Sequence, residues 1–351
     1  MKKRKIAAPA AGTAVDYAAL CEFVERFPGR KAVLFGDFVA DEFQFGEIAR
    51  VSREAPVLIL RHRETHMAPG GGANAANNLA DLGAKVLPVT AVGDDAAGDA
   101  LVEFFRAKRV DVSGVVRVKG WTTPVKTRFL AGWPHTTHQQ VLRVDREPQG
   151  ELPAEARGKL DRKLRERLQG VDVLAVSDYG FGVATPESVR AVLQRKKGEC
   201  IATLDARRDL TAYARTGITS ATPNESELEA LLQTSIGQNL PELERSGRAA
   251  LLAMKLRSLL VTRGRHGMAL FESGKPTTHI PIHGSDQAVD VTGAGDTVLA
   301  AFTLALASGA SPLEAAHLAN IAGGIVVMKR GTATVPREEL LAAIRREVTG
   351  S

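Results

Sequence analysis

Cysteine and long apolar runs are both scarce in this sequence. Only two of its 351 residues are cysteines, Cys21 and Cys200, which excludes a disulfide framework and gives no metal-ligand spacing. A reducing compartment, the cytoplasm, is therefore expected. The longest mainly apolar run covers residues 298–307, well short of the roughly 20 residues that cross a bilayer. We therefore expect no membrane partner.

The excess of positive over negative charge is also small once the first five residues are left out. The formal net charge is +6. Residues 2–5 are all lysine or arginine and supply four of these charges, so the other 347 residues carry only +2. A short basic tail is a weak electrostatic footprint for a nucleic-acid-binding protein. We therefore expect no nucleic-acid partner, and only DNA binding that survives removal of residues 1–5 would favour that class.

The length and the alternation of sequence patterns predict an α/β body. Single cores rarely grow beyond ~250–300 residues, so 351 residues favour a large domain with an appendage. Short β-branched apolar runs alternate with helical patterns, which is typical of a mainly parallel, doubly wound sheet with helices on both faces. The expected strands cover residues 32–35, 86–92, 171–176, 201–204, 218–221 and 259–262. The expected helices cover residues 74–82, 95–108, 154–168, 186–195 and 240–256.

Two stretches, residues 43–60 and 125–145, break this alternation. In them apolar and polar residues roughly alternate, with no helix between the paired runs. This pattern is typical of strands that are covered on one face and wet on the other. We interpret them as a small sheet that projects from the body, either a lid or a dimer contact. Residues 1–30 then form a tail and a helix, residues 31–345 the main domain, and residues 346–351 a second tail.

The most informative segment is the loop at residues 290–296, Asp-Val-Thr-Gly-Ala-Gly-Asp, which precedes an apolar helix. Free backbone N–H groups and the positive end of the helix dipole meet at such a helix start, and they bind phosphate. Gly293, Ala294 and Gly295 let a phosphate approach the backbone because they carry little or no side chain. Asp296 would repel that ligand unless it acts as a general base on an attacking hydroxyl. The structural alternative is that Asp296 only caps the helix.

A second glycine cluster, residues 70–72, opens an earlier helix that carries Asn74. Bare backbone and amide side chains at a helix start suit a hydroxyl-rich ligand, because donors and acceptors are both exposed. Asp37 and Asp41 follow the first strand, where open α/β sheets usually bind ligands, and their carboxylates can accept hydrogen bonds from sugar hydroxyls. The structural alternatives are a glycine-rich turn capped by Asn74 and aspartates that cap turns.

The two glycine-rich loops together resemble the motifs of the ribokinase, or PfkB, family of carbohydrate kinases. The resemblance spans residues 31–341 and is greatest to the heptose 7-phosphate kinase domain of the ADP-heptose pathway. It is carried by residues 36–37, 52–57, 69–74, 177–179, 261–264, 290–297 and 331–335. It implies a ribokinase-like three-layer fold, a doubly wound mainly parallel sheet with a small β-sheet lid. The implied reaction is ATP-dependent phosphorylation of a sugar or sugar-phosphate hydroxyl, first of all D-glycero-D-manno-heptose 7-phosphate to the 1,7-bisphosphate.

The resemblance also implies roles for individual residues. Asp296 corresponds to the catalytic base, and the N–H groups of residues 293–295 to the anion hole. The implied sugar-binding residues are Asp37, Asp41, Gly70, Gly71 and Asn74. Lys126 and Arg143 of the lid are further substrate-binding candidates, although an ordinary solvated strand face explains them as well. The implied nucleotide-binding residues are Asn224, Glu227, Arg207, Thr262, Gly264 and Asn320. Glu227 would also hold Mg²⁺ through water, although Asn224 and Glu227 can equally form a helix-capping box. A monovalent cation such as K⁺ is implied beside the anion hole.

Phe181 departs from the pattern of the heptose kinases, which tend to carry a lysine there. If that lysine holds a substrate phosphate, its loss favours other acceptors, although Lys126, Arg128 and Arg143 can compensate from the lid. Kinases of fructose, of a keto-deoxy acid or of a nucleoside therefore stay open, as does a non-catalytic sugar or nucleotide sensor. About ten residues follow the region of resemblance, so we expect no fused nucleotidyltransferase domain. We expect a homodimer that forms through the lid.

Overall fold

The computed structural model describes residues 15–132, 138–171, 173–196 and 198–349. The basic tail at residues 2–5 and residues 350–351 lie outside them. Residues 346–349, expected as part of a C-terminal tail, belong to a helix that ends at Thr349. The described strands are β1 Lys31–Gly36, β2 Phe38–Val51, β3 Leu58–Gly71, β4 Lys85–Gly93, β5 Val115–Val118, β6 Val125–Gly132, β7 Gln139–Arg146, β8 Val173–Asp178, β9 Ile201–Ala206, β10 Ser220–Ala221, β11 Ser258–Thr262, β12 Met268–Glu272 and β13 Thr278–Ile280. The described helices are α1 Tyr17–Glu25, α2 Gly72–Asp81, α3 Ala96–Ala107, α4 Ala154–Leu168, α5 Pro186–Leu193, α6 Glu225–Leu232, α7 Leu240–Met254, α8 Ala294–Ala307, α9 Pro312–Val326 and α10 Arg337–Thr349.

The larger sheet has the strand order β13-β12-β11-β10-β9-β8-β1-β4-β5 among the described residues. Its strands from β5 to β11 run parallel, and only β12 and β13 pair antiparallel at one edge. The predicted mainly parallel sheet is therefore confirmed. The antiparallel hairpin at the edge was not predicted, because two short apolar strands after a helix do not differ in pattern from the parallel ones.

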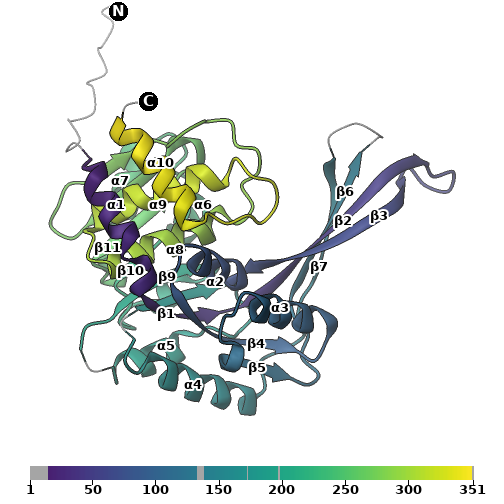
Figure 1. The fold of residues 1–351 in the computed structure, drawn as a ribbon, viewed down its shortest axis with the longest axis horizontal. Helices are drawn as coiled ribbons and strands as arrows, with labels where there is room; N and C mark the ends of the chain where they lie inside the picture. The colour runs from purple at the N-terminus through teal and green to yellow at the C-terminus, as the bar shows by residue number, and fades with distance from the viewer. Residues whose placement is uncertain (1–14, 133–137, 172, 197, 350–351) are drawn as a thin grey trace, which may run out of the picture.

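Alternate residues of the central strands enter two separate cores. Ala32 and Leu34 of β1 pack into the core that also contains α1, α2, α3, α8, α9 and α10. Val33 and Phe35 pack into the other core, with α4, α5, α6 and α7. Because successive strand side chains point to opposite faces, this alternation makes three layers, with helices above and below the sheet (Figure 1). The predicted ribokinase-like layering is confirmed.

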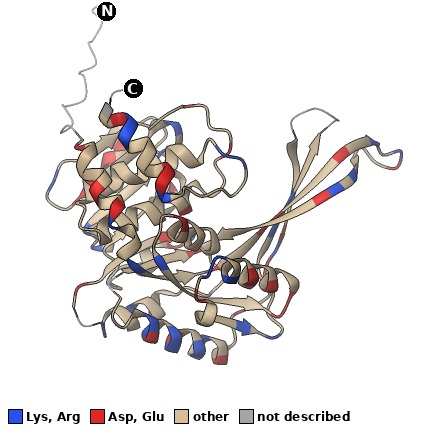
Figure 2. Cartoon of the chain, viewed as in Figure 1, with Lys and Arg blue, Asp and Glu red and all other residues tan. Residues whose placement is uncertain are grey.

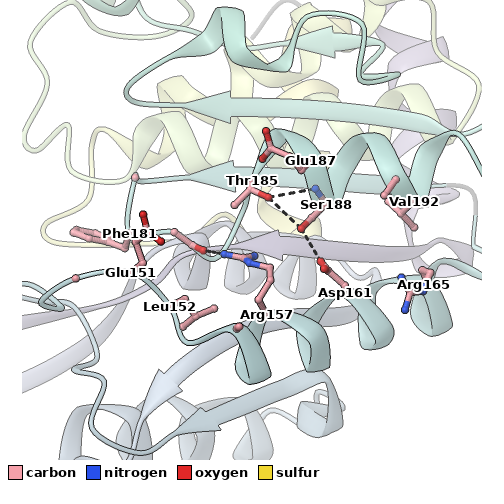
Figure 3. A pocket seen from close by; sticks show the side chains of 15 residues that line it. Glu151, Leu152, Arg157, Asp161, Arg165, Phe181, Thr185, Glu187, Ser188 and Val192 are labelled. Carbon is pink, nitrogen blue, oxygen red and sulfur yellow. Dashed lines mark hydrogen bonds between the residues drawn. The ribbon is translucent and has the colours of Figure 1, made fainter.

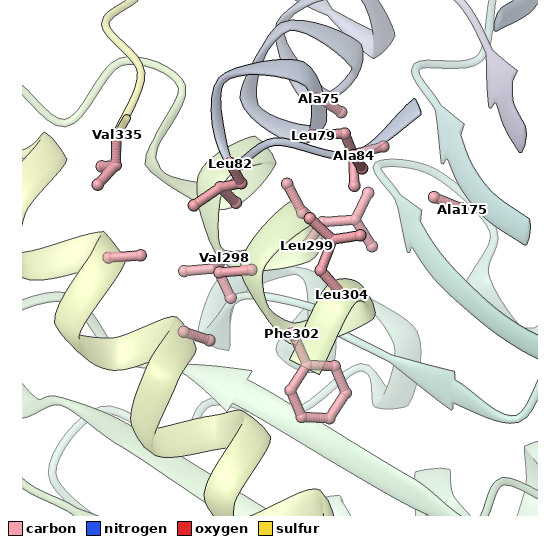
Figure 4. Close-up of a cluster of buried hydrophobic side chains, with 14 of the residues drawn as sticks. Ala75, Leu79, Leu82, Ala84, Ala175, Val298, Leu299, Phe302, Leu304 and Val335 are labelled. Carbon is pink, nitrogen blue, oxygen red and sulfur yellow. The ribbon is translucent and has the colours of Figure 1, made fainter. Parts of the chain in front are cut away.

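Helices α2 and α8 pack against each other inside the first core. Leu79 and Leu82, from the α2 segment, and Val298 and Leu299, from α8, are almost fully buried in the same cluster (Figure 4). This contact sets the N-terminal ends of the two helices side by side, although the glycine clusters before them are more than 200 residues apart. The apolar helix α8 has 14 residues. In the described part of the chain, no helix is long and apolar enough to cross a membrane.

A second sheet, in the order β3-β2-β6-β7, projects from the body (Figure 1). The structure confirms this small sheet, but β2 begins at Phe38 and β3 continues to Gly71, well outside the predicted residues 43–60. The reason is burial: at the base of the sheet Phe38, Val39 and Ala40 are all buried, so the alternating pattern is lost there. At the other side of the sheet, every residue of the edge strand β7 is exposed.

Helix α4 carries several lysine and arginine residues with acidic residues between them (Figure 2). Its buried residues, Leu160, Leu164 and Leu168, recur every four positions and face the second core. The basic residues between them lie toward solvent, and some pair with acids, as Arg167 does with Asp111. This is the arrangement of an ordinary amphipathic surface helix.

Candidate active site

Asp296 is buried at the start of α8 and both of its carboxylate oxygens accept a hydrogen bond. Asn74 of α2 donates to Oδ2 at 2.9 Å, and the hydroxyl of Tyr179 donates to Oδ1 at 3.0 Å. The N-cap position of α8 belongs to Gly293 rather than to Asp296, and no side chain caps the helix there. The structural alternative of a capping aspartate is therefore wrong, and Asp296 is a buried acid beside an uncapped helix start.

Gly293 occupies a backbone conformation that only glycine adopts without strain. Its φ is +77°, and a Cβ at this position would lie 2.4 Å from Nδ2 of Asn74. The next N–H, of Ala294, donates to the carbonyl of Val291 at 3.2 Å. Gly295 is different, because the nearest atom to a Cβ there is an oxygen of Asp205 at 4.0 Å. Open space beside Gly295, at a helix N-terminus, is the geometry that admits an anion.

Asp290 ties this loop to a second loop. Its Oδ1 accepts from the N–H of Thr292 at 2.9 Å, and its Oδ2 accepts from the N–H of Gly331 at 2.9 Å. The N–H groups of Val289 and Asp290 also donate to the carbonyl of Val327. The glycine-rich loop therefore has a fixed position relative to residues 327–332.

Tyr179 joins Asp296 to two cations. Nη2 of Arg207 donates to the Tyr179 hydroxyl at 3.2 Å, and the Arg207 guanidinium lies 4.1 Å from the centre of the tyrosine ring. Nζ of Lys126 lies 5.0 Å from the same ring centre. Both contacts fit cation–π attraction. Tyr179 directly follows β8 and Arg207 directly follows β9, so the carboxyl ends of neighbouring parallel strands bring them together.

The pKa values at this site show how crowded its acids are. Burial raises the pKa of Asp296 to about 6, against the lowering effects of Asn74, Arg207 and Tyr179. Burial, with Glu227 and Asp296 nearby, raises the pKa of Asp205 well above its usual value. A carboxyl with a pKa near neutrality is suited to accept a proton at physiological pH.

The two aspartates near β1 hold other groups in the structure. The carboxylate of Asp37 accepts three backbone N–H groups, from Tyr179 at 2.8 Å, Phe181 at 3.1 Å and Val183 at 2.9 Å. Asp41 receives a hydrogen bond from Arg128 at 2.5 Å, in an ion pair that is almost fully buried. Asp37 therefore fixes the loop that carries Tyr179.

Gly70 and Gly71, the glycines expected to bind sugar, lie directly against these aspartates. A Cβ on Gly70 would lie 2.5 Å from Oδ2 of Asp41, and a Cβ on Gly71 would lie 3.2 Å from the carbonyl of Asp37. Gly71 also has a φ of +55°, and a Cβ at this position would lie 3.3 Å from Cε2 of the Tyr179 ring. The structure thus brings the early glycine cluster, both aspartates and Asn74 to the side of the site that faces Asp296.

Among the other nucleotide-binding candidates, Asn224, Glu227, Thr262 and Gly264 lie together, and Asn320 lies on α9. Asn224 and Glu227 make a reciprocal capping box at the start of α6, with both hydrogen bonds at 2.8 Å. Thr262 lies beside Asn224, because the two residues form a parallel bridge and Gly264 follows. Asn320 of α9 donates to the carbonyl of Pro281 at 2.8 Å, so it fixes the loop before the glycine-rich segment. Burial raises the pKa of Glu227.

Arg143 and a cavity between α4 and α5 lie outside this set of contacts around Asp296. Arg143 is on the exposed edge strand β7, where it pairs with Asp145 at 2.9 Å. The cavity has a volume of about 810 Å³ (Figure 3). Arg157 on its wall donates to the carbonyl of Val183 at 2.6 Å, so the loop after β8 is held from outside by Arg157 and from inside by Asp37.

Sequence reasoning did not single out Tyr179, Asp205 or Arg128 as partners of the site. The available signal was their position in the sequence: Tyr179 and Asp205 both lie at the carboxyl ends of parallel strands, and Asp205 is two positions before the predicted site residue Arg207. Arg128 was considered only as an alternative phosphate ligand, whereas it pairs with Asp41.

The fold and this site together define a class of enzyme. A buried acid with a pKa near neutrality stands beside an uncapped helix start, at the carboxyl edge of a parallel sheet, which is an arrangement for transferring a phosphoryl group to a hydroxyl. The chain belongs to the pfkB family of carbohydrate kinases, whose model matches residues 37–339. It is therefore a carbohydrate kinase, an enzyme that transfers phosphate to an alcohol group.

The relatives and the solved structures agree with this class. The chain is 39% identical, over 89% of its own length and 62% of the relative's, to the bifunctional protein HldE of Geobacter metallireducens. It is 36% identical, over 92% of its length and 64% of the relative's, to the bifunctional protein HldE of Mesorhizobium japonicum. The chain thus spans less than two thirds of the length of these relatives. Phosphofructokinase-2 from Escherichia coli, solved in complex with potassium, shares the fold with a TM-score of 0.71 at 20% identity, over 90% of this chain and 98% of the other.

Proposed function

We propose that this kinase phosphorylates a hydroxyl of a sugar phosphate with ATP, and that D-glycero-D-manno-heptose 7-phosphate is its acceptor, giving the 1,7-bisphosphate. The observation that carries the reaction is Asp296, buried with two hydrogen-bond donors beside the uncapped start of α8. The identity of 36–39% to proteins named HldE and the resemblance to heptose 7-phosphate kinases support the acceptor.

The proposed mechanism is a direct transfer. Asp296 takes the proton from the acceptor hydroxyl, and the oxygen forms a bond to the γ-phosphorus while the bond to the β–γ bridging oxygen breaks. The electron pair of that bond leaves with ADP. N–H groups at the start of α8 stabilise the negative charge on the transferring group, and Arg207 supplies a cation from the neighbouring strand.

Lys126 supports an acceptor that carries its own phosphate. The ammonium group lies over Tyr179, whose hydroxyl contacts the base, and it has no ion-pair partner within 4 Å among the described residues. Burial, with Arg207 nearby, lowers the pKa of Lys126, because a second positive charge disfavours the charged form. Asp41 and Asp145 attract this ammonium group without forming an ion pair with it. A bound phosphate would add a negative charge in direct contact, and Lys126 would then take the role of the lysine that Phe181 replaces.

The carboxylates near Arg207 fit a magnesium ion. Asp205 is buried and Glu227 is half-buried, and the pKa values of both acids are raised; a cation relieves such crowding. In the described residues, no group of three or more His, Cys, Asp and Glu side chains is arranged to hold a metal ion. We propose that Glu227 holds Mg²⁺ mainly through water, with the phosphates of ATP as its other ligands. The ion would neutralise charge on those phosphates.

A potassium ion would fit between the two loops that Asp290 joins. The carboxylate of Asp290 is already shared between the N–H groups of Thr292 and Gly331, so backbone carbonyls of the two loops would supply most ligands. The potassium complex of phosphofructokinase-2, a protein of the same fold, supports this proposal. Replacing K⁺ by a larger organic cation in the assay should lower turnover.

We propose that the chain forms a homodimer through its small sheet. The edge strand β7 exposes Val141, Leu142 and Val144, which are 44%, 55% and 46% accessible. Unpaired edge strands with exposed apolar side chains readily pair with another chain. Leu142→Lys should convert the dimer to a monomer in analytical ultracentrifugation, whereas the surface change Leu252→Lys on α7 should not. A monomeric wild-type protein at micromolar concentration would contradict the proposal.

The acceptor is tested by a panel of sugars, sugar phosphates, keto-deoxy acids and nucleosides, with ADP formation as the readout. We expect heptose 7-phosphate to give the highest kcat/KM. Lys126→Met should raise KM at least tenfold for the phosphorylated acceptor, while Lys119→Met, on the exposed surface, should leave KM unchanged. A higher kcat/KM with fructose or a nucleoside would replace the acceptor. Ligand binding without ADP formation for any acceptor would indicate a non-catalytic sensor.

A further inference from the structure

The hydroxyl of Tyr179 contacts two charged groups of the site. It lies between Arg207 and Asp296, at 3.2 Å and 3.0 Å. A guanidinium nitrogen only donates, so the tyrosine oxygen is the acceptor in the first contact. The single hydroxyl hydrogen is then left for Oδ1 of Asp296. The chain of hydrogen bonds runs in one direction, from the cation to the base.

The ring of Tyr179 is also held on several sides. The backbone N–H of Tyr179 donates to the carboxylate of Asp37 at 2.8 Å. The guanidinium of Arg207 lies 4.1 Å from the ring centre, and the ammonium of Lys126 lies 5.0 Å from it. The backbone of Gly71 packs against the edge of the ring, so closely that a Cβ there would lie 3.3 Å from Cε2. The side chain is only 8% exposed. A hydroxyl held so firmly fixes the direction of any hydrogen bond that it donates.

The second oxygen of the base is fixed independently. Nδ2 of Asn74 donates to Oδ2 of Asp296 at 2.9 Å, and Asn74 is itself held by Asn78. Two donors on two different oxygens leave the carboxylate group no freedom to rotate about its Cβ–Cγ bond. The remaining lone pairs then have a defined direction.

We propose that Tyr179 is a positioning residue for the base: its hydroxyl, polarised by Arg207, orients the Asp296 carboxylate and keeps it ionised for the acceptor hydroxyl. This proposal rests on the proposed function. A hydrogen bond to the charged form of a carboxyl favours that form, and one donated under the influence of a cation is stronger than a neutral one. Tyr179 therefore opposes the burial that disfavours a charge at this position.

Several other charged or titratable groups face Asp296 and must be counted with Tyr179. They come from each element that packs against it: Arg207 after β9, Asp205 in β9 and Asp41 in β2. Arg207 stabilises the charged carboxylate, whereas Asp205 and Asp41 disfavour it. Tyr179 itself stays neutral, because burial and the Asp296 charge raise its pKa well above its usual value. Its role is therefore donation and not proton transfer.

The direct test measures the pKa of Asp296 by ¹³C NMR of carboxyl-labelled aspartate, with the signal assigned from Asp296→Asn. In Tyr179→Phe we expect this pKa to rise by about one pH unit, the size of one hydrogen bond to a charged group. Site-specific 3-fluorotyrosine at position 179 keeps the contacts and makes the hydroxyl a stronger donor, so it should lower the same pKa. An unchanged pKa in both proteins would overturn the proposal.

The kinetic test uses the pH profile of ADP formation with the acceptor. In Tyr179→Phe, the midpoint of the acid limb should move up by about one unit, which by itself lowers kcat at pH 7 about twofold. Loss of the fixed carboxylate direction should bring the total fall in kcat to about tenfold, with KM for ATP unchanged. The matched control is Tyr213→Phe, which removes another buried tyrosine hydroxyl, the one that donates to Asp178 at 2.7 Å. This control should keep the wild-type midpoint.

These experiments distinguish a failure of the proposed function from a failure of the positioning role of Tyr179. If wild-type protein turns over no acceptor, the proposed function fails, while the NMR titration still reports whether Tyr179 lowers the pKa of Asp296. If the wild type is active and Tyr179→Phe changes only KM or thermal stability, to the same extent as Tyr213→Phe, then the hydroxyl is merely structural and the positioning role is wrong.

Discussion

Asn74 donates its side-chain N–H to the carboxylate of Asp296 across 222 positions of sequence. The bond joins the start of α2 to the start of α8, and so joins the glycine cluster expected to bind the acceptor to the one expected to bind phosphate. The two helices are pressed together by apolar residues farther along, such as Leu79 and Leu299. Core packing therefore sets the distance between the two halves of the site.

Asp296→Asn should lower kcat by about 10²–10⁴-fold, the usual contribution of a general base. Asparagine has nearly the same shape but cannot take a proton at neutral pH. ATP binding, measured by isothermal titration calorimetry, should be nearly unchanged, because the backbone at the start of α8 is kept. Full activity in this variant would rule out Asp296 as the base.

The rate should depend on pH with an acid limb near pH 6. The base works only when ionised, and burial raises the pKa of Asp296 to about 6. Activity, measured as kcat/KM, should therefore rise about tenfold per pH unit below 6 and level off above it. The same shift from 3.8 means that the stability contributed by this carboxyl is fully present below pH 3.8 and is lost as the pH rises through about 6. An acid limb centred near pH 4 would contradict this assignment.

Two neighbouring glycines should respond differently to alanine. In Gly293→Ala, the φ of +77° and the 2.4 Å approach to Asn74 should cost about 1–2 kcal/mol from the backbone alone and displace the partner of the base. We expect kcat to fall at least about a hundredfold, with a lower Tm. In Gly295→Ala, where the nearest atom is 4.0 Å away, the fold should be kept and KM for ATP should rise. Equal losses of Tm in both variants would contradict this reading.

Breaking the buried pair between Arg128 and Asp41 should destabilise the small sheet. Their side chains are 11% and 5% exposed, and the pair joins strands β6 and β2. Arg128→Met leaves the buried carboxylate of Asp41 without its partner, which should lower the free energy of unfolding by about 3 kcal/mol. This value is at the low end for buried ion pairs because Lys126 lies opposite Asp41. Urea unfolding of the two single variants and of the double variant with Asp41→Asn gives the coupling. Additive losses would show that the two charges do not interact.

The acceptor should lose affinity in the same Arg128 variant. Asp41 is expected to bind a sugar hydroxyl, and Arg128 fixes the direction of its carboxylate. We expect KM for the acceptor to rise about tenfold with KM for ATP unchanged. A change in kcat alone would place Arg128 outside the acceptor site.

The sequence by itself determined the layered α/β body, the small sheet and the two glycine-rich loops. These depend on local rules: periodicity separates strands from helices, and bare backbone at a helix start binds anions. The loop at residues 290–296 could therefore be chosen without knowing what surrounds it. The same rules failed to predict the strand residues at the base of the small sheet. Phe38, Val39 and Ala40 are all buried there, so apolar and polar residues no longer alternate.

Only the tertiary structure decided what each polar residue does. The carboxylate of Asp37 was expected to bind sugar, and the structure directs it to three backbone N–H groups of the loop after β8. Tyr179 becomes a partner of Asp296 because β8, β9 and α8 converge at one edge of the sheet. Such contacts join residues more than 100 positions apart, and their directions depend on how two buried cores position the strands. Local pattern specifies which groups are present, and long-range packing decides which of them meet.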